Sequence, residues 1–169
     1  MLRIGREARG PLIDGLESPS ELVRATSAEL LGQSTAISAL AELTLALAHD
    51  PSLEVRIRAT RALGLIGAPS SVDALAAALA SDQPVPLRAV ATRALGRIGG
   101  PRTISLLREA LDAPEHIVAA NAASALALAG DDGEQVLISA GADATTRKGQ
   151  YAREGLAQIE LQRFARVRS

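Results

Sequence analysis

One segment of the chain occurs twice at a fixed spacing. Residues 55–67 read VRIRATRALGLIG, and residues 87–99, which begin 32 positions later, read LRAVATRALGRIG. The same step separates Gly32, Gly64 and Gly96. A constant period of this length is typical of repeat arrays, in which each unit buries its apolar face against its neighbours. The sequence therefore predicts a stack of similar units and not a closed globule.

The period extends over most of the chain, with one slip. Residues 94–99 correspond to residues 125–130 at a spacing of 31, and the unit after residue 131 is degenerate. We expect a single repeat domain over residues 1–169, with atypical end units. Pairing each first helix with the helix that follows it gives about five helical hairpins and a tail, at residues 3–32, 33–67, 68–99, 100–130, 131–160 and 161–169.

The composition favours helices throughout. Aromatic residues make up only 1% of the chain, hydrophobic residues make up 47%, and Ala and Leu dominate. No segment shows the strict alternation of a half-buried strand. We therefore predict an all-α fold, an α-solenoid or α-α superhelix of about five hairpins. Asp50 and Pro51 are expected to open a helix, because Asp caps free N–H groups and Pro suits a first turn.

The chain offers few groups for catalysis or metal binding. It contains no Cys and no Trp, and its two histidines, His49 and His116, are far apart in the sequence. We expect both to cap or to be solvated. No Ser lies in a nucleophile-elbow motif, and no acidic run has the spacing of a calcium loop. We therefore expect no enzyme activity, no cofactor and no metal site.

Charge and hydropathy restrict the cellular setting. The net charge of −1 argues against binding nucleic acid or an anionic membrane through the whole molecular surface. No apolar run approaches the roughly 20 residues that cross a bilayer, and charged residues stand where a secretory signal would be apolar. We expect a cytoplasmic protein.

Helical geometry divides residues 55–67 into two faces. At about 100° per residue, the stripe expected to be buried comprises Val55, Ala59, Ala62, Leu63 and Ile66. The more exposed arc comprises Ile57, Arg58, Thr60, Arg61, Gly64 and Leu65.

Stacking of neighbouring helices would bring four arginines together: Arg58, Arg61, Arg93 and Arg97. Guanidinium groups pair well with carboxylate or phosphate, so we predict a basic patch that binds a partner. The alternative is a solvated face on which acids such as Glu29 and Glu54 neutralise these arginines.

The units from Asp50 through Gly67, followed by residues 72–79, resemble HEAT-like repeats of the short bacterial kind first noticed in phycobilin lyase subunits. The resemblance is strongest over residues 19–130 and weakest after 131, where Lys148 replaces the expected Val. It implies a solenoid whose second helices line the concave side and bind partners there. Among such repeats, scaffolds and adaptors are far more common than enzymes, although fold alone does not decide function.

The resemblance also implies a structural ladder between repeats. The ladder residues are Asp50, Asp82, Arg24, Arg56 and Arg88. Each Asp precedes an Arg by six residues, and the three arginines recur at the repeat period. A stacking contact has a reason to return in every unit, whereas a residue that binds one partner does not.

These observations favour a non-catalytic scaffold or adaptor that binds a peptide or helix of another protein on its concave face. The alanine-rich residues 119–127 offer a shallow apolar surface for a helix. One alternative is a nucleic-acid-binding HEAT-like protein, although the aromatic residues that help such proteins to grip a duplex are missing. Another is a subunit of a bilin lyase. If the end repeats leave the core uncapped, the chain will dimerise or join a larger assembly through them.

Overall fold

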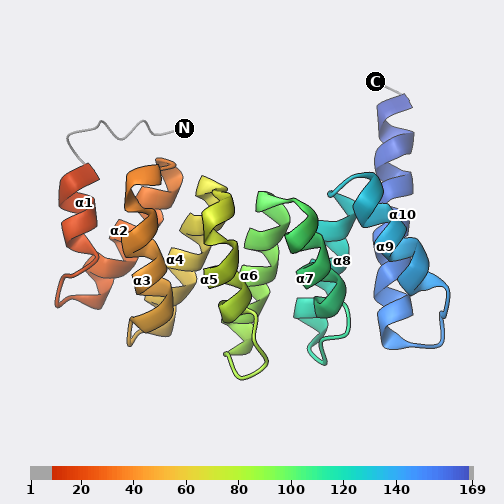
Figure 1. The fold of residues 1–169 in the computed structure, drawn as a ribbon, viewed down its shortest axis with the longest axis horizontal. Coiled ribbons are helices and arrows are strands. Elements are labelled where there is room, and N and C mark those ends of the chain that lie inside the picture. The colour runs from red at the N-terminus through yellow and green to blue at the C-terminus, as the bar shows by residue number, and fades with distance from the viewer. Residues whose placement is uncertain (1–8, 168–169) are drawn as a thin grey trace. The chain divides into compact units, whose positions relative to one another are not determined.

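The computed structural model describes residues 9–167, and every regular element in that range is helical (Figure 1). Two short 3₁₀ helices, Ile37–Ala39 and Pro69–Ser71, precede α3 and α5. The α-helices are α1 (Arg9–Gly15), α2 (Glu21–Gln33), α3 (Leu40–His49), α4 (Leu53–Ile66), α5 (Val72–Ala78), α6 (Val85–Ile98), α7 (Pro101–Ala110), α8 (His116–Ala127), α9 (Asp131–Gly141) and α10 (Arg147–Val167).

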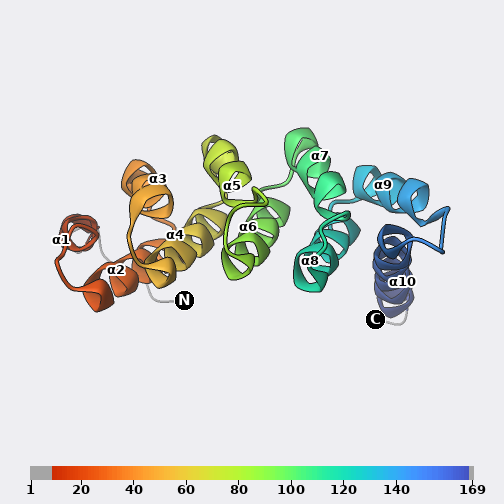
Figure 2. The same ribbon diagram turned by 90° about the horizontal axis from the view of Figure 1, so that it is seen from below.

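The contacts between helices form two compact units, one ending at Ile98 and one starting at Gly99. In the first unit, α1, α3 and α5 form one layer and α2, α4 and α6 form the other (Figure 2). In the second unit, α7 and α9 form one layer and α8 and α10 the other. We call these the first-helix layer and the second-helix layer of each unit, because every hairpin contributes one helix to each.

The repeat period places a leucine at the centre of each layer. The second helices and the first helices each contribute one series of leucines, and every member is at most 1% exposed. Burying one such side chain stabilises the fold by about 1.5–3 kcal/mol. The second helices contribute Leu31, Leu63, Leu95 and Leu126, and the first helices contribute Leu43, Leu75, Leu107 and Leu137. On α4, four of the five residues expected to be buried are at most 1% exposed, while Ile66 is half-buried.

The second helices of the first unit approach each other closely at glycines. A Cβ atom on Gly32 would lie 2.6 Å from the Ala62 Cα, and one on Gly64 would lie 2.6 Å from the Ala94 Cβ. Real Cβ atoms do not approach other heavy atoms so closely, so α2, α4 and α6 can pack in this way only because these positions lack a side chain. Two of the glycines that recur at the repeat period, Gly32 and Gly64, therefore permit close helix packing.

Two residues assigned to the exposed arc of α4 are buried instead. Thr60 is fully buried and Gly64 is buried. The Thr60 hydroxyl donates to the Arg56 carbonyl oxygen at 2.7 Å, and the Thr92 hydroxyl donates to that of Arg88 at 2.8 Å, so neither polar group is left unsatisfied. The assignment was wrong because α4 packs against α2, α3 and α6, which cover more of its surface than one stripe.

The start of α4 also differs from the prediction. Ser52, and not Asp50, is the N-cap residue, and its hydroxyl accepts from the Val55 N–H at 3.4 Å. The Asp50 carboxylate instead accepts from the Ser52 N–H at 2.8 Å and from the Arg24 side chain. Asp50 therefore binds Arg24 of another repeat and the N–H of the N-cap residue, and it does not cap the N–H groups within α4.

The first rung of the ladder joins Arg24 of α2 to Asp50, which follows α3. Arg24 Nε lies 2.7 Å from Asp50 Oδ2, and Arg24 Nη2 lies 3.1 Å from Oδ1. Partial burial raises the pKa of Asp50, but the hydrogen bonds from Arg24 and Ser52 and the Arg24 charge outweigh it and leave that pKa below its usual value. Bidentate pairing of this kind fixes orientation as well as charge.

The second and third arginines of the ladder bind carbonyl groups at the ends of the preceding helices. Arg56 Nε donates to the Leu47 oxygen at 3.1 Å, and Arg88 Nε donates to the Leu79 oxygen at 3.3 Å. Arg56 Nη2 also donates to Gln83 Oε1 at 2.5 Å. Its partner across the repeats is thus Gln83 and not Asp82, the exposed residue next to it. Free carbonyls at helix ends recur in every hairpin, which gives the recurring arginine a structural role.

We expect Gly64→Ala to lower the free energy of unfolding by about 1–3 kcal/mol, because the added methyl group overlaps Ala94. Chemical denaturation followed by circular dichroism measures this change. Gly10→Ala is the matched control, since nothing lies within 4 Å of a Cβ on this helical glycine. Equal stability of the Gly64→Ala variant and the wild type would contradict the close approach of α4 and α6.

We expect Asp50→Asn to lower the melting temperature at pH 7 by roughly 4 °C, because the variant loses the charged partner of Arg24. The folded-state pKa of Asp50 is depressed, so its contribution is present above the unfolded value of about 3.9 and is lost as the pH falls through the folded value. The difference in melting temperature between wild type and variant should therefore shrink progressively as the pH is lowered below about 3.9. Asp14→Asn, at an exposed carboxylate, is the control; a pH-independent difference for Asp50→Asn would count against the rung.

Candidate partner-binding surface

Three of the four arginines predicted to form a basic patch lie together on α4 and α6. Arg61 and Arg93 hold the same register on neighbouring second helices, and Arg97 follows Arg93 by one turn. With Val90 and Ala94 they line a shallow depression of about 50 Å³. All three arginine side chains are exposed, and none has a hydrogen bond or ion pair with another described residue. We call Arg61, Arg93 and Arg97 the arginine cluster.

Arg58, the fourth arginine of the predicted patch, is engaged by two acids. Its Nε lies 2.6 Å from Glu54 Oε1, one helical turn away, and its Nη1 pairs with Glu29 Oε2 on α2. The hydrogen bond to Glu54 is the main reason that the pKa of Arg58 lies above its usual value. The alternative, in which acids such as Glu29 and Glu54 neutralise the arginines, therefore holds for Arg58. It does not hold for the arginine cluster.

The preceding helix carries the opposite charge at the cluster's register. Glu29 on α2 occupies the same repeat position as Arg61 on α4 and Arg93 on α6. Successive members of this series are 32 residues apart. Because Glu29 is paired with Arg58, its charge is compensated locally. Three exposed guanidinium groups without a carboxylate partner can donate several hydrogen bonds to carboxylates or to a phosphate.

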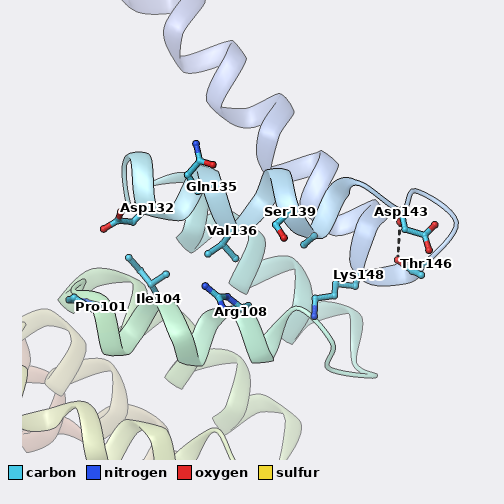
Figure 3. A pocket seen from close by; sticks show the side chains of 11 residues that line it. Pro101, Ile104, Arg108, Asp132, Gln135, Val136, Ser139, Asp143, Thr146 and Lys148 are labelled. Carbon is cyan, nitrogen blue, oxygen red and sulfur yellow. Dashed lines mark hydrogen bonds between the residues drawn. The ribbon is translucent and has the colours of Figure 1, made fainter.

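A second concave feature lies between α7 and α9 in the second unit (Figure 3). This groove has a volume of about 690 Å³. Its lining comes from α7, α9, the loop that follows α9 and the start of α10: Pro101, Ile104, Arg108, Asp132, Gln135, Val136, Ser139, Ala140, Asp143, Thr146 and Lys148. No motif in the sequence predicted this groove. The lining residues of α7 and of α9 are spaced so that they share one face of each helix. Every stripe that faces the core has this spacing, so it does not indicate a groove.

The histidines and acids of the described residues do not assemble a metal site. No group of three or more His, Asp or Glu side chains within residues 9–167 is arranged to hold a metal ion. His116, the first residue of α8, is exposed to solvent as expected, and its Nδ1 also lies 2.9 Å from the Tyr151 hydroxyl, with the two ring centroids 5.4 Å apart. None of the described helices is long and apolar enough to span a membrane.

Solved structures with a similar arrangement of helices come from several sources. The complex of CpcE and CpcF of phycocyanin lyase from Nostoc sp. PCC7120 matches with a TM-score of 0.66 and 23% identity, over 92% of this chain and 65% of that chain. YibA of Escherichia coli matches with a TM-score of 0.67 and 22% identity, over 98% and 64%. This chain therefore spans less than two thirds of the length of either.

A designed armadillo repeat protein in complex with the peptide (KR)4 matches with a TM-score of 0.63 and 20% identity, over 90% of this chain and 82% of that chain. At these identities, the similarities show the fold alone, and they confirm the predicted all-α solenoid class. No curated protein sequence matches the chain. The profile of the HEAT repeats matches residues 40–127, which is more than half of the chain. The chain therefore belongs to the HEAT repeat family.

Proposed function

We propose that this chain is a non-catalytic scaffold that binds an acidic peptide or helix of a partner protein on the second-helix layer of its first unit. The arginine cluster carries the proposal, since Arg61, Arg93 and Arg97 face one depression and lack any carboxylate partner among the described residues. Exposed arginines without local acids repel one another, and an anionic partner relieves that repulsion.

The charge and composition of the chain favour a protein partner over a nucleic acid. Proteins that bind nucleic acid tightly neutralise many phosphates and stack bases on aromatic rings. This chain has a net charge of −1 and 1% aromatic residues, and the arginine cluster brings only three positive charges together. A few carboxylates on one face of a peptide or helix match such a cluster better than a continuous phosphate backbone.

Two of the similar structures support a binding role. The designed armadillo repeat protein holds the peptide (KR)4, so helical stacks of this kind accept a charged peptide. The arginine cluster of the present chain has the sign of charge that suits an acidic peptide in place of a basic one. CpcE and CpcF form a complex with each other, which supports a protein as the partner.

The test is a direct comparison of charged peptides. We expect fluorescein-labelled (Glu-Asp)4 to bind at low salt and labelled (Lys-Arg)4 to bind much more weakly, as measured by fluorescence anisotropy. The double variant Arg61→Glu, Arg93→Glu should weaken binding of (Glu-Asp)4 roughly tenfold or more, because two attractive charges become repulsive. Salt should weaken binding to the wild type, since the charges are exposed.

Arg102→Glu on α7 is the control, because it reverses the charge of an exposed arginine outside the arginine cluster. Equal affinities of wild type and double variant, with unchanged circular dichroism, would overturn the proposal. Retardation of DNA or RNA in a gel at low salt, together with no binding of (Glu-Asp)4, would instead favour the nucleic-acid alternative.

A further inference from the structure

The groove between α7 and α9 has a charge pattern that the arginine cluster does not explain. It lies on the first-helix layer of the second unit, whereas the arginine cluster lies on the second-helix layer of the first unit. Asp132 lies near one end of the groove and Arg108 lies near its middle, as Figure 3 shows. Both side chains are exposed, and neither has a hydrogen bond or ion pair with another described residue.

Aliphatic side chains line the groove beside these charges. Ile104 on α7 lies between Asp132 and Arg108, and Val136 on α9 lies opposite Arg108 (Figure 3). Beyond Arg108, Lys148 lines the groove with its ammonium group held by Asp112 at 2.5 Å, and the far end carries Asp143 (Figure 3). From Asp132 to Arg108, the groove thus presents a carboxylate, aliphatic side chains and a guanidinium group in turn.

The dimensions limit what fits. Pro101 and Arg108 line the groove from the same face of α7 and are seven residues apart, which corresponds to about 10 Å along the helix axis. Three residues of extended peptide cover a similar distance at about 3.3 Å each. The volume of about 690 Å³ also lies within the range of sites for small ligands and short peptides.

We propose that this groove is a second binding site, and that it takes a short extended peptide segment with aliphatic residues between a basic and an acidic residue. The basic side chain pairs with Asp132, the aliphatic residues pack on Ile104 and Val136, and the carboxylate binds the Arg108 guanidinium. The segment is dipolar, so it differs from the uniformly acidic partner proposed for the arginine cluster. The two sites do not share a residue, and each stands without the other.

The probe is the peptide Ac-Lys-Leu-Leu-Glu-NH2, titrated into the ¹⁵N-labelled full chain and followed by amide chemical shifts. We expect shifts confined to residues 101–108 and 132–148. Ac-Lys-Ser-Ser-Glu-NH2, without the aliphatic residues, and Ac-Ser-Leu-Leu-Ser-NH2, without the charges, should each bind at least about fivefold more weakly.

Three variants separate the roles of the charges. Arg108→Ala and Asp132→Asn should each weaken binding of Ac-Lys-Leu-Leu-Glu-NH2 by about fivefold, and Arg108→Lys should retain part of the affinity. Arg102→Ala is the control, since it removes the same charge from α7 outside the groove. The double variant Arg61→Glu, Arg93→Glu should bind this peptide as the wild type does, which separates a failure of this site from a failure of the arginine cluster.

Three outcomes would overturn the proposal. The first is shifts spread over the chain or centred on residues 61–97. The second is equal affinity of the wild type and the Arg108→Ala variant, both with unperturbed spectra. The third is equal binding of all three peptides, because the proposed mode requires both the aliphatic side chains and the two charged groups.

Discussion

The close approach of neighbouring second helices sets the geometry of the first unit. Gly32 faces Ala62 and Gly64 faces Ala94, so the backbones of α2, α4 and α6 pack without side chains between them. Larger residues at the glycine positions would force the helices apart and strain the leucine core on their other side. The second unit uses a related contact, where a Cβ on Gly155 of α10 would lie 3.0 Å from the Ala123 carbonyl oxygen of α8.

This packing determines which arginines remain available. Because α2 lies close to α4, Glu29 reaches Arg58, and that pair becomes part of the structure. Arg61, on the same face of α4 but one turn further along, lies with Arg93 and Arg97 of α6. Buried or recurring polar groups, such as Thr60 and Arg56, satisfy backbone carbonyls and serve the fold. The arginine cluster differs, because its guanidinium groups make no hydrogen bond or ion pair with another described residue.

The two layers of a unit provide different kinds of surface. In the second unit, α8 and α10 pack closely, whereas α7 and α9 make few contacts and leave a groove between them. The reason is local: small residues line the α8 and α10 contact, whereas α7 carries Ile104 and Arg108 toward α9 (Figure 3). A stack of hairpins can thus present a closely packed surface on one layer and a recess on the other.

The period of the sequence by itself determined the helical repeat, the leucine series and the glycine contacts, because a stacking interaction must return with every unit. It also indicated the arginines of α4 and α6. Only the tertiary structure decided that Arg58 is neutralised by Glu29, that Gln83 takes the place of Asp82, and that Thr60 is buried. These outcomes depend on which side chains of different helices meet, and helical periodicity describes one helix at a time. The groove between α7 and α9 belongs to the same class, since it arises from the separation of two helices and not from any motif.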